Sequence, residues 1–373
     1  MMQFAKAGFI NVNKKYLIVV FVFIVCTLSF ARSFLGLAGI IPWHYGYSDV
    51  FNADRINPLN AQKTPYLEVQ IEYPVITGFF IYLMWYFGKS LLGYALSTYA
   101  FLTIYAVIAA IYLYKFARES DIDGKKIWPF FVFAPSLLVF GVYNWDIIAV
   151  MFAVLAIYFF KKEKFLLAAL FIGLGFNAKI FPVVFLPFML LRVDFKKAIK
   201  MILVFALVFL ALNSYFIINN LDNWKATYTF HSSRDPNIDS IWHLTGLSAV
   251  TINLLSSFLF ILAYSYFLIR HKRYSILELC LISILLLLLF AKVFSPQYIL
   301  WLLPFFVILK TNKAAFYSLE ILNLIVLFLT LYWMFKGSTN VLLIAISLAV
   351  LGRTLILAFV LYIKTVRHKS INS

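Results

Sequence analysis

The sequence predicts an all-α integral membrane protein, a polytopic bundle of about 12 transmembrane helices (roughly 11–13). Hydrophobic residues make up 64% of the 373 positions and charged residues only 13%, so a soluble fold could not cover its surface with polar groups. The apolar residues fall in long runs, and many approach the roughly 20 residues that a bilayer core of ~30 Å requires. Basic residues lie in short clusters between these runs, as the control of topology requires.

Hydropathy along the chain locates the expected helices in order. The predicted spans are 16–38, 91–116, 127–143, 147–160, 165–179, 180–191, 200–218, 249–269, 274–293, 299–310, 314–335 and 341–363. The first run is too long for the apolar core of a signal peptide and is expected to be retained. The segment 73–87 is apolar but short, so we expect a re-entrant or partly inserted helix that does not cross. Residues 1–373 are expected to form one membrane domain, because no stretch outside the membrane is long enough to fold alone.

The distribution of Lys and Arg predicts how the chain is oriented. Under this topology, 22 of the 32 Lys and Arg residues fall in loops and termini of one face, and eight fall on the other. Cytoplasmic loops carry such an excess, so both termini are expected in the cytoplasm of a multi-pass plasma-membrane protein. The net charge of +17 arises from these clusters and does not indicate a nucleic-acid groove. Cys26 and Cys280 lie in apolar runs, and no disulfide framework is expected.

Two long loops, 40–90 and 219–249, are expected on the extracytoplasmic face and carry most of the candidate chemistry. A carboxylate just beyond the first span can act as a general base on an acceptor hydroxyl. Sugar transfer with inversion needs one such base and cationic or hydrogen-bonding groups for a departing phosphate. The outer-face candidates for the phosphate are Lys179, His231, Arg234 and Lys292.

Six short motifs follow one another along the segments expected on this face. They are Ser48-Asp49-Val50, Pro65-Tyr66, Glu72-Tyr73-Pro74, Asn144-Trp145-Asp146, Asn177-Ala178-Lys179-Ile180-Phe181-Pro182 and Phe294-Ser295-Pro296-Gln297-Tyr298. Their order resembles the GT-C superfamily of membrane glycosyltransferases, and within it glycosyltransferase family 87, the polyprenyl-phosphate-mannose-dependent α-mannosyltransferases. The resemblance runs from residue 40 to about 310. It departs from the family pattern at Pro74-Val75, where Pro-Pro is usual.

The resemblance implies an inverting transfer of a hexose, mannose first, from a polyprenyl-phosphate donor to a lipid or glycan acceptor. Asp49 takes the role of general base, and Glu72 is expected to orient the base or the acceptor. The implied substrate-binding residues are Asp54, Tyr66, Asn144, Asp146, Lys179, His231, Arg234, Lys292 and Gln297. No cofactor or metal is expected, because the histidines lack ligand spacing, no Asp-x-Asp pair marks a metal site and there is no nucleotide-binding loop.

Other interpretations stay open at this point. Asp54 is the rival base to Asp49, Asp146 is also explained as a helix cap, and Lys179 as a lysine that extends to the membrane interface. A transporter or lipid flippase would build its polar cavity from repeated halves. A polysaccharide polymerase or ligase would use a lipid-diphosphate donor and a large loop rich in Arg and His. A non-catalytic assembly subunit would tolerate the loss of Asp49.

Overall fold

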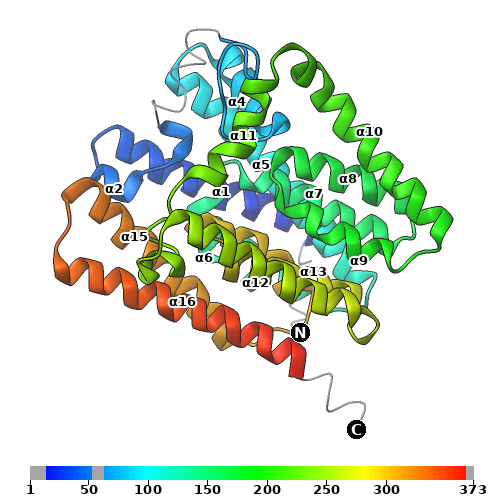
Figure 1. The fold of residues 1–373 in the computed structure, drawn as a ribbon. Helices are drawn as coiled ribbons and strands as arrows, with labels where there is room; N and C mark the ends of the chain where they lie inside the picture. Colours follow the sequence, from blue (N-terminus) through cyan, green and yellow to red (C-terminus); the bar gives the residue numbers. More distant parts are fainter. Residues whose placement is uncertain (1–13, 53–62, 367–373) are drawn as a thin grey trace, which may run out of the picture.

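The computed structural model describes residues 14–52 and 63–366, whose named elements are all helices, with no β-strand among them (Figure 1). Six helices in these ranges are long and apolar enough to cross a membrane. They are α1 (Lys14–Leu37), α5 (Leu91–Arg118), α10 (Phe195–Asn219), α12 (Ala249–Ile269), α15 (Lys313–Lys336) and α16 (Asn340–Val366). The all-α, multi-pass membrane architecture is confirmed, whereas the expected number of about 12 crossings is not.

Shorter elements fill the bundle and connect the long helices. The shorter α-helices are α2 (Trp43–Gly46), α4 (Val75–Gly88), α6 (Pro135–Phe140), α7 (Asp146–Lys161), α8 (Phe165–Ala178), α9 (Leu186–Leu190), α11 (Leu221–Ser233), α13 (Ile276–Phe290) and α14 (Leu303–Ile308). The 3-10 turns are η1 (Asp49–Phe51), η2 (Gly124–Lys126), η4 (Phe181–Phe185), η5 (Ile241–Thr245), η6 (His271–Arg273) and η7 (Pro296–Trp301), and η3 (Trp128–Val132) is a π-helical turn.

Three predicted spans, 127–143, 180–191 and 299–310, are wrong as single helices. Each consists of a 3-10 or π-helical turn followed by an α-helix of only five or six residues. Proline interrupts the first of them, because it lacks a backbone N–H and disfavours helical backbone in the preceding residue. Ala134, for example, is extended, with ψ 129°, directly before Pro135 at the start of α6.

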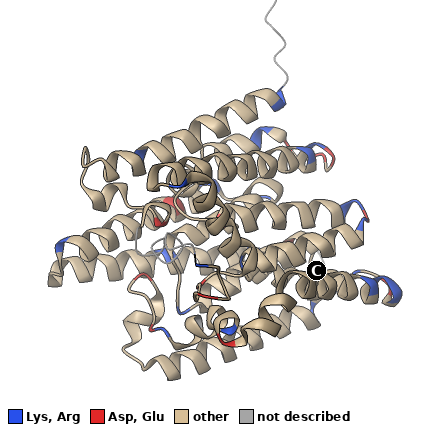
Figure 2. Cartoon of the chain, turned by 90° about the horizontal axis from the view of Figure 1, so that it is seen from above, with Lys and Arg blue, Asp and Glu red and all other residues tan. Residues whose placement is uncertain are grey.

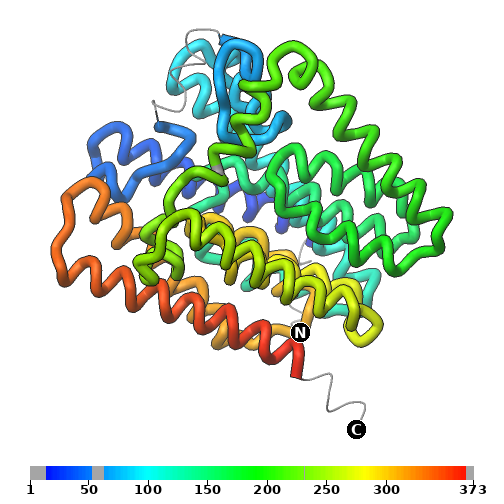
Figure 3. The backbone as a smooth tube through the Cα atoms, in the orientation of Figure 1, coloured from blue at the N-terminus to red at the C-terminus, as the bar shows by residue number. Residues whose placement is uncertain are grey.

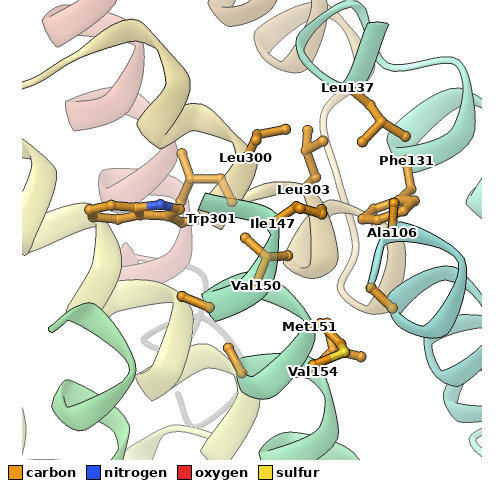
Figure 4. Close-up of a cluster of buried hydrophobic side chains, with 14 of the residues drawn as sticks. Ala106, Phe131, Leu137, Ile147, Val150, Met151, Val154, Leu300, Trp301 and Leu303 are labelled. Carbon is orange, nitrogen blue, oxygen red and sulfur yellow. The ribbon is translucent and has the colours of Figure 1, made fainter. Parts of the chain in front are cut away.

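The interrupted helices lie inside the bundle, where protein surrounds them. Figure 4 shows side chains of α7 between η7–α14 on one side and α5 with η3 on the other. The labelled contributors are Ala106, Phe131, Leu137, Ile147, Val150, Met151, Val154, Leu300, Trp301 and Leu303, all of them buried. Irregular backbone is tolerated at membrane depth only in such protein-lined surroundings. The unbroken helices α10 and α12, by contrast, are largely exposed along their apolar windows.

Helix α4 is the short apolar segment of the first loop. Its 14 residues rise ~21 Å, less than the ~30 Å of a bilayer core, and that it does not cross stays a prediction. Lys89 ends the helix in the left-handed conformation, with φ 53°. Gly88 and Gly93 then bring α4 against α5, because a Cβ on Gly88 would lie 2.1 Å from the backbone nitrogen of Tyr94.

Basic segments that are far apart in sequence meet at one end of the bundle. The contacts are Lys126 Nζ to the Leu309 carbonyl at 3.2 Å, Lys162 Nζ to Glu119 at 2.8 Å, an Arg192 amine to the His271 carbonyl at 2.6 Å and Lys364 Nζ to the Lys310 carbonyl at 2.9 Å. Figure 2 shows Lys and Arg gathered at the ends of several helices, and Figure 3 shows the hairpin of α15 and α16 returning to that end. The structure therefore places these predicted segments on one face of the molecule.

Candidate active site

A cavity of about 480 Å³ lies at the opposite end of the bundle. It collects the carboxyl-terminal ends of α8 and α13, whose amino-terminal ends follow the basic segments 161–164 and 270–273. Its polar lining consists of Asp49, Glu72, Asn144, Lys179, Thr227, Arg234, Asn237, Asp239, Lys292, Ser295, Gln297 and Thr330. Its aromatic lining consists of Tyr47, Tyr73, Tyr143, Phe181, Tyr298 and Trp301. Seven of the predicted site residues thus share one cavity.

Asp49 lies at the cavity wall and is only 5% exposed. It opens the short η1 turn, where the Ser48 hydroxyl accepts from the Val50 amide and donates to the Tyr143 carbonyl at 2.9 Å. One carboxylate oxygen of Asp49 accepts from the Tyr47 hydroxyl at 2.9 Å, and the other accepts from the Asn144 amide at 2.6 Å. The turn therefore presents an oriented carboxylate to the cavity, held by partners from the first loop and from the turn between α6 and α7.

Asp146 lies behind the wall and is fully buried. Its carboxylate accepts from the Trp301 indole at 2.7 Å and pairs with Lys179 Nζ at 2.8 Å. Lys179 itself faces the cavity, 4.7 Å from the ring centre of Tyr298 and 6.0 Å from that of Tyr73. The carboxylate therefore holds a cation at the cavity wall, and the aromatic faces add cation–π attraction.

A second group of cations lies between the loop that follows α11 and the end of α13. Lys292 Nζ donates to the carbonyls of Ser232 at 2.9 Å and Arg234 at 2.7 Å. An Arg234 amine donates to the Asn237 side chain at 2.7 Å. Gln297, buried at the start of η7, completes this part of the lining. These side chains offer positive charge and hydrogen-bonding groups to an anionic ligand.

Two ionisable groups of this wall are shifted by their surroundings. Burial, followed by the nearby charge of Arg234, lowers the pKa of Lys292. Burial raises the pKa of Asp239 to about 6, although the positive charge of Arg353 opposes the shift. Desolvation is therefore the largest cause of the pKa shift for both residues, as expected for groups withdrawn from water.

Apolar side chains line the two flanks of the cavity. One flank consists of Ile180, Val184, Leu287 and Leu288, and the other of Leu327, Leu331 and Met334. Each flank has a well-exposed member, Ile180 at 40% and Met334 at 55%. Both lie in a chain with membrane-spanning helices, so each flank leads from the polar cavity towards the apolar surface.

The remaining predicted residues lie elsewhere. Tyr66 is fully buried against Val75 and Phe216, and its hydroxyl donates to the Tyr73 carbonyl at 2.7 Å, so it supports the loop and does not line the cavity. Asp54 lies outside the described residues. His231 lies within α11, and its side chain is also outside what the structure describes.

Several cavity residues are not singled out by sequence reasoning as site residues. Asp239 lies in the loop between α11 and η5 without a recognisable motif, and Trp301 is one aromatic residue among many near the ends of apolar runs. The indole of Trp301 stacks between Phe181, at 4.4 Å, and Tyr298, at 4.2 Å. The one feature of the sequence that could have identified Trp301 as a site residue is its position three residues after the predicted Gln297-Tyr298 motif.

No group of three or more His, Cys, Asp and Glu side chains capable of holding a metal gathers within residues 14–52 and 63–366. The expectation that the reaction needs no metal or other cofactor remains a prediction.

The fold and this cavity define a multi-pass membrane protein with a site that combines polar and charged groups with apolar flanks. The family model "Glycosyltransferase family 87" matches residues 72–296. The chain belongs to glycosyltransferase family 87, and is therefore a membrane glycosyltransferase, as the motif resemblance implies. The matched range includes Glu72, Asn144, Lys179, Arg234 and Lys292, whereas Asp49 and Gln297 lie outside it.

No curated protein matches the sequence. Among solved structures, the chain is similar to ArnT from Cupriavidus metallidurans bound to undecaprenyl phosphate, with 12% sequence identity and a TM-score of 0.49. The similarity covers 94% of this chain and 77% of the ArnT chain.

Proposed function

We propose that the protein transfers a hexose, with inversion, from a polyprenyl-phosphate donor to a lipid or glycan acceptor. The observation that carries the proposal is the shared cavity, which combines the oriented Asp49 carboxylate, three cations and two apolar flanks. Membership of family 87 supplies the reaction class. Resemblance to the polyprenyl-phosphate-mannose-dependent members makes mannose the first sugar to test.

The proposed chemistry is a single displacement at the anomeric carbon. An acceptor hydroxyl attacks this carbon as Asp49 takes its proton, and the bond from carbon to phosphate oxygen breaks with its electron pair on the leaving phosphate. Lys179, Arg234 and Lys292 offset the charge that develops on that phosphate. The aromatic rings of the lining, Tyr73 and Tyr298 among them, provide faces on which the sugar can stack.

The two flanks suggest separate routes for the two substrates. Ile180 follows Lys179 directly and opens onto the apolar surface, so this flank suits the polyprenyl tail of a donor whose phosphate lies at the cations. The flank with Met334 adjoins the base. The ring centre of Phe335, the next residue, lies 5.8 Å from that of Tyr47, whose hydroxyl donates to Asp49. This side suits a lipid acceptor whose hydroxyl must reach the base.

The proposed orientation follows from the charge bias. The basic end of the bundle faces the cytoplasm with both termini, and the cavity faces outward. Residues 1–373 then form one membrane domain, with 40–90 and 219–249 as its extracytoplasmic loops. In this arrangement the donor is drawn from the outer leaflet, and no nucleotide sugar is needed at the site.

A transfer assay with purified protein in lipid tests the proposal. Radiolabelled polyprenyl-phosphate-mannose is supplied with a membrane-lipid acceptor extract, in parallel with a nucleotide sugar and a lipid-diphosphate sugar. We expect label transfer from the polyprenyl-phosphate donor alone. Transfer only from the lipid-diphosphate donor would instead indicate a polymerase or ligase. Failure of all three, and of glucose- and arabinose-linked polyprenyl phosphates, would favour transport or assembly.

A further inference from the structure

Arg353 is a charged residue in the middle of α16, a helix apolar enough to cross the membrane, and its side chain is fully buried. It does not line the cavity. A charge at such a position is costly and is retained where it has partners and a role. Its partners therefore show what the charge does.

The guanidinium group contacts three separate parts of the chain. One amine donates to the Asn323 side chain of α15 at 2.9 Å, and the other donates to the carbonyl of Phe294, at 3.2 Å, and to that of Asp239. The guanidinium carbon lies 3.8 Å from the ring centre of Phe294. Asn323 in turn donates to the Pro296 carbonyl at 2.8 Å. Arg353 thus joins α15 and α16 to two irregular segments.

These two segments, 234–242 and 290–297, form the cation-bearing wall. They are also bonded to each other. The bonds are the Asn237 amide to the Lys292 carbonyl at 3.3 Å, the Ser240 hydroxyl to the Ala291 carbonyl at 3.1 Å and the Trp242 indole to the Phe290 carbonyl at 3.0 Å. Arg353 holds both segments from behind, since it bonds to a carbonyl of each. The distance between the two segments therefore sets the positions of Arg234, Lys292 and Gln297 relative to one another.

We propose that Arg353 is a positioning residue that sets the phosphate-binding geometry of this wall through its bonds to Asn323, Phe294 and Asp239. The inference rests on the proposed function and adds a residue outside the cavity to its donor site. Loss of these bonds lets Lys292 and Gln297 move relative to Arg234, so binding of the phosphate weakens. The base is held by other elements, through Tyr47 and Asn144, so the orientation of Asp49 is kept.

Glu320 provides a matched control. It is also an ionisable residue buried completely in α15, and it accepts from the Ser136 amide at 2.7 Å. Neither Glu320 nor Ser136 lines the cavity. Glu320→Gln therefore perturbs a buried charge without touching the wall. It separates a loss of general stability from a loss of phosphate binding.

The test measures binding of undecaprenyl phosphate to detergent-purified full-length protein by native mass spectrometry, with undecaprenol as the phosphate-free probe. Arg353→Gln removes the charge and the guanidinium bonds to Asn323, Phe294 and Asp239. Asn323→Leu removes the bonds of Asn323 to Arg353 and Pro296 and keeps the charge of Arg353. Arg353→Lys keeps the charge and restores part of the hydrogen bonding. We expect Arg353→Gln and Asn323→Leu to weaken undecaprenyl phosphate binding about tenfold, with Arg353→Lys intermediate and Glu320→Gln like wild type. In transfer assays, the donor KM rises, and kcat falls as well, because Arg234 and Lys292 also offset the charge that develops on the leaving phosphate.

Wild-type affinity in folded Arg353→Gln and Asn323→Leu would overturn the inference, and so would an equal loss in Glu320→Gln. Size exclusion and melting temperature report folding, and Asn323→Leu keeps the test usable where Arg353→Gln does not fold. If wild-type protein fails to prefer undecaprenyl phosphate over undecaprenol, the proposed function fails first, and the two failures are distinguishable.

Discussion

Two buried carboxylates near the cavity, Asp49 and Asp146, differ in what holds them and in what they face. Asp49 accepts from a tyrosine hydroxyl and an asparagine amide, and it lines the cavity. Asp146 is paired with Lys179 and bonded to Trp301, and it lies behind the wall. Of the two carboxylates, that of Asp49 reaches the cavity, whereas that of Asp146 is occupied by Lys179 and Trp301. Asp49 is therefore suited to accept a proton from a substrate, and Asp146 to hold a lysine in place.

The largest expected effect is on catalysis by Asp49. Asp49→Asn keeps the size of the side chain and removes its basicity, so turnover should fall about 1,000-fold, the middle of the range for general acid–base catalysis. Initial rates of label transfer under saturating donor measure the loss. Asp49→Asn with near wild-type turnover, in protein that elutes as a folded species, would move the base to another carboxylate.

The next effect concerns stability at Asp146. Asp146→Asn leaves Lys179, which is only 17% exposed, without its ionic partner, and breaking a buried pair in this way costs about 3–5 kcal/mol. Melting temperature should fall clearly, and Asp146→Asn combined with Lys179→Met should recover much of it while transfer stays low.

The surface pair of Asp222 and Lys225 is the matched control for that experiment. Its members are 80% and 52% exposed, so Asp222→Asn should leave the melting temperature unchanged. Equal shifts from Asp146→Asn and Asp222→Asn would show that Asp146 is not the structural carboxylate described above.

A smaller effect depends on pH at Asp239. Burial raises its pKa to about 6 from an ordinary 3.8, so its ionised form costs folding free energy above pH 6, up to about 3 kcal/mol. That cost is relieved as pH falls from about 6 towards 4. Asp239→Asn should therefore raise the melting temperature at pH 7.5 and approach wild type near pH 4.5. The same difference at both pH values would contradict this account of the wall.

The smallest effect tests the orientation of the base. Tyr47→Phe removes one hydrogen bond to Asp49, and the loss of a bond to a charged group is worth roughly a tenfold reduction in kcat. Binding of undecaprenyl phosphate should not change. Tyr158→Phe, whose hydroxyl donates to Glu119 at the basic end of the bundle, is the control and should keep full turnover. Equal effects of the two variants would argue against a specific role for Tyr47.

The sequence predicts the long helices well because hydropathy measures how apolar a segment is. The predicted spans 91–116 and 249–269, for example, appear as α5 (Leu91–Arg118) and α12 (Ala249–Ile269). Hydropathy does not report whether an apolar segment is regular. The apolar segment 127–143 is divided at Pro135, and the apolar segment 299–310 begins within a 3-10 turn.

The composition of the site was predictable to a smaller extent. Motif order grouped Asp49, Asn144 and Lys179, and the structure places all three on one cavity. The pairing of Lys179 with Asp146, and of Arg353 with residues 114 and 59 positions away, could not be inferred, because no local periodicity links such positions. The same holds for Tyr66, which is a plausible ligand by sequence and a packed loop residue in the structure.

The central claim is that Asp49 acts as the base in transfer from a polyprenyl-phosphate sugar. Its most direct test loads wild type and Asp49→Asn with radiolabelled polyprenyl-phosphate-mannose and measures bound donor and transferred label in the same samples. The account predicts equal donor binding and transfer by wild type alone. Transfer at the wild-type rate by folded Asp49→Asn would contradict it.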